Sequence, residues 1–221
     1  MLQVEKDPVL MGYVRSIEDK LNMVQVKPAP RATFELGRRR TAEQLVILLA
    51  QAWGLNDKFQ AFADVWKAKL RREKYLTGLA EQDDLEQGLL PKRRKRAIEK
   101  VWRGYQGDAT RLRDLVRCSL VFETVEHMEA AVDVILSDPS VQILRVKNRF
   151  AEGYDARKES CGYRDIQLNA VVTEQNFSAD EIALGLHEHV CEIQLHLQPI
   201  YELKNDEGHK RYVTFRNQRA E

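Results

Sequence analysis

The spacing of apolar residues divides the chain into a helical first half and a second half that alternates like strands. After Thr41 the apolar positions recur every three or four residues, which predicts one helix ending near Gly54 and a second over residues 57–75. A third helix is expected over residues 92–104, with Pro91 in its first turn. The first forty residues show the weakest pattern.

After Gly107 the period changes from helical to alternating, which predicts a sheet. The expected strands cover residues 115–122, 141–149, 163–172 and 190–197, and the expected helices cover residues 125–136 and 200–205. We therefore expect an α+β fold, a mixed β-sheet flanked by helices, preceded by a helical N-terminal region. The predicted boundary separates a helical extension, residues 1–90, from a sheet-containing domain, residues 91–221.

One face of the predicted sheet is polar on every strand, because successive side chains point to opposite faces. Its members are Arg117 and Ser119; Arg145, Lys147 and Arg149; Tyr163, Asp165, Gln167 and Asn169; and Glu192, Gln194 and His196. An antiparallel sheet with one solvated face would also alternate in this way. Solvated faces are usually rich in Lys, Glu and Thr, whereas these side chains favour directional hydrogen bonds. The pattern is therefore compatible with a solvated face and with a binding site, and the residue types favour the binding site.

Composition and charge exclude several classes of protein. The chain has 221 residues, 43% of them hydrophobic and 31% charged, which is typical of a folded domain and not of a low-complexity chain. With 35 basic and 34 acidic residues the net charge is +1, so electrostatic binding must come from local clusters. The 3 cysteines lack disulfide or zinc spacing. No apolar run approaches the about 20 residues of a membrane span, so we expect a cytoplasmic protein without a membrane partner.

Four short motifs in the second half resemble those of a known family. They are Asp114-Leu-Val-Arg-Cys-Ser-Leu-Val, Cys161-Gly-Tyr-Arg-Asp-Ile-Gln, Cys191-Glu-Ile-Gln-Leu-His and, more weakly, Glu207-Gly-His-Lys-Arg-Tyr. Their order and spacing resemble the synthetase domain of the RelA/SpoT family and of small alarmone synthetases. Those enzymes transfer pyrophosphate from ATP to the ribose 3'-hydroxyl of GDP or GTP. The resemblance covers residues 91–221 and implies a nucleotidyltransferase-like fold and a GTP/GDP diphosphokinase-like transferase.

The resemblance also implies roles for individual residues. Asp114 matches the aspartate that holds Mg²⁺, and Glu192 matches the glutamate that coordinates Mg²⁺ or activates the attacking hydroxyl. Magnesium usually takes few protein carboxylates and shares its other positions with phosphates and water. Without the motifs, Asp114 would read as a turn residue and Glu192 as a cross-strand ion-pair partner.

Basic and aromatic residues complete the implied nucleotide sites. The expected ATP ligands are Arg93, Arg96, Lys100 and Arg111, of which the first three lie in a basic run on the third predicted helix. The expected acceptor ligands are Lys147, Arg149, Lys158, Tyr163, Gln167, Asn169, Gln194, His196 and His209, with Tyr163 stacked on the base. A solvated cationic edge or a half-buried sheet tyrosine would explain several of them equally well.

Three departures from the family pattern concern the acceptor. Arg117 stands two places from the usual arginine, Gln167 replaces a histidine, and His196 replaces an arginine. They leave open a guanosine acceptor, an adenosine nucleotide or the 3' end of tRNA as in toxic relatives, and a catalytically inactive binding module. A homo-oligomer, and a partner-binding role for the helical first ninety residues, are also left open. No hydrolase His-Asp pair is found, and His187 with His189 is a weak metal candidate.

Overall fold

The computed structural model describes residues 7–27, 36–37, 39–73, 91–160 and 162–205, without the side chains of residues 91–93 and 203–205. The helices are α1 (Pro8–Asn22), α3 (Thr41–Arg72), α4 (Pro91–Gly104), α5 (Val125–Leu136), α6 (Ala156–Ser160), α7 (Ala179–Ala183) and α8 (Gln198–Asn205). Single 3-10 turns are η2 (Ala109–Arg111), η3 (Glu174–Asn176) and η4 (Leu186–Glu188). None of the described helices is both long and apolar enough to cross a membrane.

The sheet has four strands in the order β1-β4-β3-β2, where β1 is Val116–Phe122, β2 Val141–Asn148, β3 Ile166–Val172 and β4 Cys191–Leu197. The pair β1 and β4 is parallel, and the pairs β4–β3 and β3–β2 are antiparallel. This arrangement confirms the predicted mixed sheet flanked by helices, and all four strands lie where the alternation predicted them. The third strand begins at Ile166 and not at Tyr163, because Gly162, with φ of 86°, turns the chain just before it.

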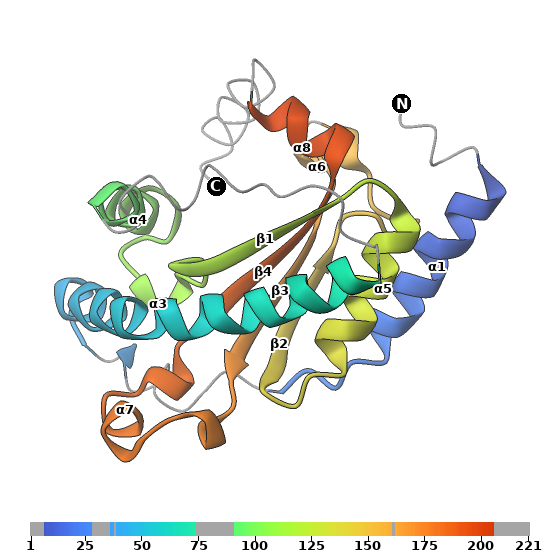
Figure 1. Ribbon diagram of the computed structural model, residues 1–221. Coiled ribbons are helices and arrows are strands. Elements are labelled where there is room, and N and C mark those ends of the chain that lie inside the picture. The colour runs from blue at the N-terminus through green and yellow to red at the C-terminus, as the bar shows by residue number, and fades with distance from the viewer. Residues whose placement is uncertain (1–6, 28–35, 38, 74–90, 161, 206–221) are drawn as a thin grey trace.

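Helices α3 and α5 pack on the apolar face of the sheet, and α1 packs on α5 (Figure 1). One hydrophobic core joins them, with Ile17 of α1, Phe59 and Trp66 of α3, and Ile193 of β4 all at 1% exposure or less. Covering one face with helices leaves the opposite face for the polar residues. The helical N-terminal half thus shares its core with the sheet.

Helix α3 runs without interruption from Thr41 to Arg72, so the expected break at Gly54 is wrong. A glycine inside a helix costs about 1 kcal/mol relative to alanine, which the buried stripe on both sides of Gly54 outweighs. A Cβ at Gly54 would lie 3.2 Å from Cδ1 of Leu186, so the glycine lets η4 approach the helix.

Helix α1 lies in the segment whose pattern was weakest. Its N-terminus is nevertheless regular, because the Asp7 side chain accepts hydrogen bonds from the backbone of Val9 and Leu10 and Pro8 occupies the first turn. Val14, Ile17 and Leu21 form a short buried stripe. A signal of three residues is shorter than the stripes of α3, which explains why the pattern did not reveal it.

Strand β2 contains a register shift between Ile143 and Arg145. Strict alternation with Arg145 and Lys147 on the polar face would place Leu144 on the apolar face. Ile143 is instead the buried residue there, and Leu144 is the extra residue of the irregularity. After the shift, Lys147 pairs with Gln167, which returns the polar side chains of β2 to the polar face.

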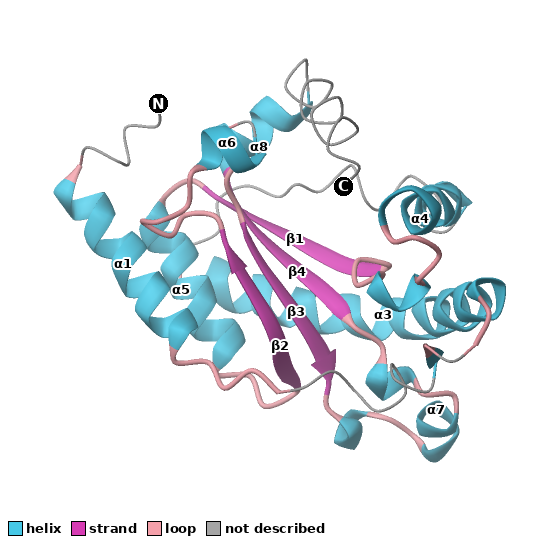
Figure 2. Ribbon diagram, turned by 180° about the vertical axis from the view of Figure 1, so that it is seen from behind, coloured by secondary structure: helices cyan, strands magenta, loops and turns pink. Residues whose placement is uncertain are grey.

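Two groups of helices flank the polar face. Helix α4 lies beyond the β1 edge, near the start of β1 and the N-terminal part of α3 (Figure 2). Helices α6 and α8 lie together near the opposite ends of the strands, where β4 leads directly into α8 (Figure 2). We call these the α4 end and the α8 end of the polar face.

Candidate active site

The strand register aligns the polar side chains in rows across the sheet. Nearest the α4 end, Glu192 pairs with Arg117 on one side and with Asn169 on the other. The next row contains Ser119, Gln194, Gln167 and Lys147. Residues from all four strands therefore meet on one surface, although they come from segments far apart in the sequence.

Asp114 and Glu192 form a pair of carboxylates at the α4 end. The Asp114 Oδ2 atom lies 2.8 Å from Nζ of Lys100. Burial acts to raise the pKa of Asp114, but the Lys100 ammonium outweighs it and holds that pKa below its ordinary value. Burial, followed by the negative charge of Asp114, raises the pKa of Glu192. The two carboxylates thus interact electrostatically at the α4 end, where the charge of Asp114 contributes to the raised pKa of Glu192.

The Asp114 carboxylate also keeps Lys100 charged. Burial acts to lower the pKa of Lys100, but Asp114 and Tyr105 together outweigh it, so the pKa is raised. The Lys100 ammonium lies 5.4 Å from the ring centroid of Tyr105, and the Arg111 guanidinium lies 4.7 Å from the same centroid. Cations over an aromatic face attract it electrostatically. Tyr105 therefore organises two expected ATP ligands, a role that the sequence pattern did not suggest.

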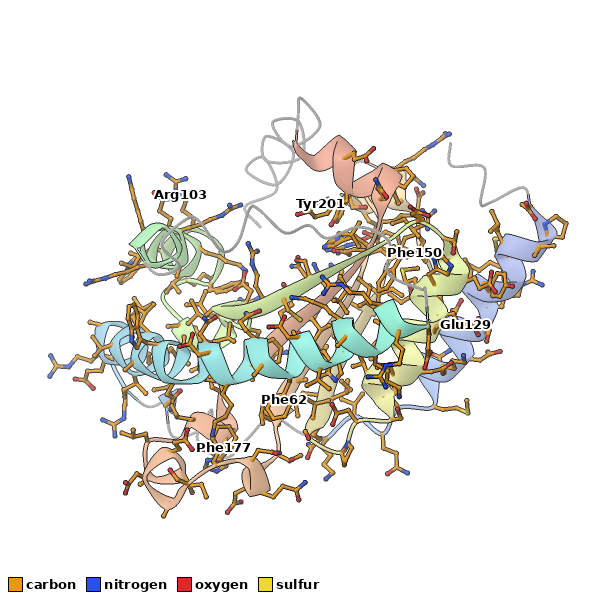
Figure 3. The ribbon with its side chains drawn as sticks, viewed as in Figure 1. Phe62, Arg103, Glu129, Phe150, Phe177 and Tyr201 are labelled. Carbon is orange, nitrogen blue, oxygen red and sulfur yellow. The ribbon has the colours of Figure 1, made fainter. Side chains whose placement is uncertain are left out.

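The remaining expected ATP ligands lie on α4. Arg96 is exposed and stands one turn before Lys100, and Arg103 is exposed on the same helix (Figure 3). The backbone of Arg93 belongs to the helix, but its side chain lies outside the described residues. Of this group the structure brings Lys100 into contact with a candidate catalytic residue.

Gln194 connects the carboxylate pair to the rest of the polar face. Its Nε2 donates to Glu192, and its Oε1 accepts from Ser119 Oγ at 3.3 Å. The Nε2 atom of His196 also lies 3.3 Å from that Oε1. Because Gln194 is 6% exposed, it supports its neighbours more than it presents a surface of its own.

Tyr163 and His196 meet at the α8 end. The Tyr163 hydroxyl lies 3.0 Å from Nδ1 of His196, and the two ring centroids are 6.3 Å apart. On its other side His196 packs against Tyr201 of α8, with 5.2 Å between centroids (Figure 3). His196 is fully buried, whereas Tyr163 is partly exposed, so the tyrosine is the member of this pair that a ligand can reach.

Arg149 and Asp165 form a buried ion pair beside Tyr163, in which Arg149 Nη1 donates to Asp165 Oδ1. The Arg149 guanidinium lies 5.8 Å from the Tyr163 ring centroid. Asp165 was placed on the polar face by its alternation but was not selected as a site residue. Its place among the polar residues Tyr163 and Gln167 is the signal in the sequence that points to it.

The other expected acceptor residues are spread around the face. Lys147 and Gln167 are partly exposed, and Lys158 is exposed on α6 with its Nζ 3.3 Å from Asp155. Asn169 is buried and donates to the backbone oxygen of Arg113 at 3.5 Å, just before Asp114. His209 lies outside the described residues.

The two carboxylates fit a magnesium ion by the chemistry of their donors. Asp114 and Glu192 offer hard oxygen atoms at the same end of the polar face, and one or two carboxylates are the usual protein share of a Mg²⁺ site that also binds phosphates. Among the residues described, no group of three or more His, Cys, Asp or Glu side chains is arranged to hold a metal. At the weaker metal candidate, His189 is buried 3.4 Å from Gln51, and burial lowers its pKa to about 4.

No family model matches the chain, and no curated protein matches its sequence. Solved structures do resemble it. Against small alarmone synthetase 1 from Bacillus subtilis, one structure gives 18% identity and a TM-score of 0.41 over 57% of this chain and 65% of that one. The structure of the same enzyme bound to its product pppGpp is 15% identical to this chain, with a TM-score of 0.45, and the match covers 80% of this chain and 87% of that one. A GTP pyrophosphokinase family protein from Streptococcus pneumoniae is 14% identical, with a TM-score of 0.43, and the match covers 81% of this chain and 84% of that one.

A further likeness is to a complex between the type VI effector Tas1 and its immunity protein. The identity is 15% and the TM-score 0.39, over 69% of this chain and 61% of that one. At these identities the likeness concerns the fold. The chemistry must therefore be argued from the residues of this chain.

Proposed function

We propose that the protein is a magnesium-dependent pyrophosphokinase that transfers pyrophosphate from ATP to the 3'-hydroxyl of a guanosine nucleotide. The observation that carries this proposal is the pairing of Asp114 with Glu192, next to Lys100, at one end of a polar sheet face. Phosphoryl-type transfer relies mainly on positioning and charge neutralisation, which such a cluster provides.

In the proposed reaction the 3'-hydroxyl oxygen of the acceptor attacks the β-phosphorus of ATP. A bond forms between them, the bond from that phosphorus to the oxygen shared with the α-phosphate breaks, and AMP leaves. Asp114 and Glu192 would hold the magnesium ion, which supplies charge neutralisation to the phosphates when bound. Glu192 also accepts the hydroxyl proton, a role suited to a carboxyl group whose pKa burial has raised.

In this proposal the two ends of the polar face bind different substrates. Lys100 and Arg111, with the exposed Arg96 of α4, favour ATP at the α4 end because cations bind phosphate oxygens. Tyr163 favours the acceptor base at the α8 end, where its partly exposed ring offers a stacking surface. Glu192 and Gln194 lie between the two, where the hydroxyl and the β-phosphate would meet.

An adenosine nucleotide and the 3' end of tRNA are the alternative acceptors. The neutral amide of Gln167, which is partly exposed, can donate and accept hydrogen bonds, so it suits either purine. The exposed residues of α4 include Lys95, Arg96 and Trp102, and Trp102 is 62% exposed. A cationic helix with an exposed aromatic is compatible with RNA, which is the observation that keeps tRNA as the second candidate.

The test is incubation of the purified protein with ATP labelled on the γ-phosphate, magnesium and, separately, GDP, GTP, ADP, ATP or bulk tRNA. The proposal predicts label in a guanosine product. Label on tRNA or on an adenosine nucleotide would show that this molecule, and not a guanosine nucleotide, is the acceptor. Nucleotide binding without any product would favour an inactive binding module.

Two variants link the activity to the site. We expect Glu192→Gln to lose about 100-fold or more in turnover, since it removes a proton acceptor and a metal ligand together. Glu174→Gln makes the same chemical change at an exposed position on η3 and should retain full activity. Equal activity in the two variants would remove Glu192 from the mechanism.

A further inference from the structure

The Asp165 carboxylate receives hydrogen bonds from three side chains around the acceptor end. One oxygen accepts from Arg149 Nη1. The other accepts from the Tyr163 hydroxyl at 3.2 Å and from Gln167 Nε2 at 3.1 Å. With 1% exposure Asp165 is out of reach of a ligand, so it acts through the residues that it holds.

A buried ion pair of this kind is poorly explained by stability alone. Removing a carboxylate and a guanidinium from water is costly, and well-packed apolar residues of similar volume are often as stable or more stable. Arg149 is 6% exposed, so both partners bear that cost. The pair does, however, fix the orientation of the groups hydrogen-bonded to it, which an apolar pair cannot do.

The Tyr163 hydroxyl is held from two directions. Asp165 lies on one side at 3.2 Å, and His196 lies on the other at 3.0 Å. The two contacts are compatible when Nδ1 of His196 carries the ring proton, because it then donates to the tyrosine oxygen and the hydroxyl hydrogen is left for Asp165.

We propose that Asp165 is a positioning residue that fixes Tyr163 and Gln167 in the arrangement that binds the base of the acceptor nucleotide. This inference rests on the proposed function, since it assigns the α8 end to the acceptor. Its specific content is that Asp165 governs acceptor binding and leaves ATP binding unchanged, because its contacts lie at the α8 end and none reaches Lys100 or Asp114.

The test measures equilibrium binding of GDP, GTP, ADP and ATP, each alone, together with the KM for each in the transfer reaction. Asp165→Asn keeps the shape of the side chain but places an amide where Arg149 needs an anion. Tyr163→Phe keeps the ring and the ion pair but removes the held hydroxyl. We expect each variant to weaken binding of the acceptor nucleotide about 5- to 20-fold, the range for loss of one or two buried hydrogen bonds.

Three comparisons separate positioning from general damage. ATP binding should stay within about twofold, and the double variant should be no weaker than Asp165→Asn alone, because both changes break the same contact. Asp180→Asn, an exposed aspartate on α7, is the matched control and should bind like the parent. If the urea midpoint shows that Asp165→Asn does not fold, the binding measurements on Tyr163→Phe test the inference in its place.

Equal losses for ATP and acceptor, or no loss for either, would overturn the inference. The binding measurements distinguish a failure of the positioning role from a failure of the proposed function. A parent protein that binds a guanosine or adenosine acceptor and transfers nothing disproves the activity, while selective weakening by Tyr163→Phe still supports the positioning role. A parent that binds none of the nucleotides overturns both.

Discussion

Replacing Lys100 with methionine tests the electrostatic account of the carboxylate pair. Methionine preserves most of the length of the side chain and removes its charge. The change leaves Asp114 without the cation 2.8 Å from its Oδ2 atom. It also removes one of the positive charges that counteract the raised pKa of Glu192. Both carboxyl groups should therefore become harder to ionise.

The size of the effect follows from how far the pair is buried. The side chains of Lys100 and Asp114 are 24% and 30% exposed, so this ion pair is intermediate between an exposed pair and a fully buried one. Exposed pairs contribute about 0–1 kcal/mol, and breaking a fully buried pair costs about 3–5 kcal/mol. We expect Lys100→Met to lower the free energy of unfolding by about 1–3 kcal/mol at neutral pH.

The sign of the pH dependence is specific. Because Asp114 has a lowered pKa in the folded protein, its contribution is present above its unperturbed value of 3.8 and is lost as the pH falls through the folded value. Lys100 has a raised pKa, so its contribution persists until strongly alkaline pH. The difference between parent and variant should thus be largest near neutrality and shrink in acid.

Urea denaturation in metal-free buffer measures this difference at neutral pH and at steps below 3.8. Lys95→Met is the matched control, because Lys95 is exposed on the same helix. It should change the unfolding free energy by less than about 0.5 kcal/mol. A constant difference between parent and Lys100→Met at every pH would refute the electrostatic reasoning and point to lost packing.

Three further predictions concern the scaffold. Phe59→Ala should lower the unfolding free energy by about 3–5 kcal/mol in urea titrations, because Phe59 is 0% exposed, whereas Val65→Ala at 63% exposure should change it little. Gly185→Ala should cost about 1–3 kcal/mol by the same measurement, since φ is 72° and the new Cβ would lie 2.8 Å from Gln51 Nε2. His189 has a pKa lowered to about 4, so the parent should lose up to about 3 kcal/mol between neutral pH and that value. His189→Gln, neutral throughout, should lose less, and parallel pH curves would contradict this.

The fold was largely predictable because strand alternation is a local signal. The four strands and α5 follow from the spacing of apolar residues, and so do the rows of polar residues once the register is known. Gly54 was misleading because its cost is small beside the buried stripe of α3. The extra residue Leu144 could not be foreseen, since a register shift depends on the partner strand.

The candidate site was predictable in its residue types and less so in its contacts. The motifs selected Asp114, Glu192 and Tyr163, but the sequence gives no sign that Lys100 pairs with Asp114 fourteen positions away. The ion pair similarly joins Arg149, just after β2, to Asp165, just before β3. Arg149, expected as an acceptor ligand, is thereby buried against its carboxylate partner.

The most direct test of the central claim is to identify what ATP becomes when the protein acts. Phosphorus NMR of a reaction containing the protein, magnesium, ATP and the acceptor resolves AMP from ADP and counts the phosphates gained by the acceptor. Attack on the β-phosphorus predicts AMP and an acceptor carrying two additional phosphates, in equal amounts. ADP with a singly phosphorylated acceptor, or ATP left unchanged with every acceptor offered, would contradict the account.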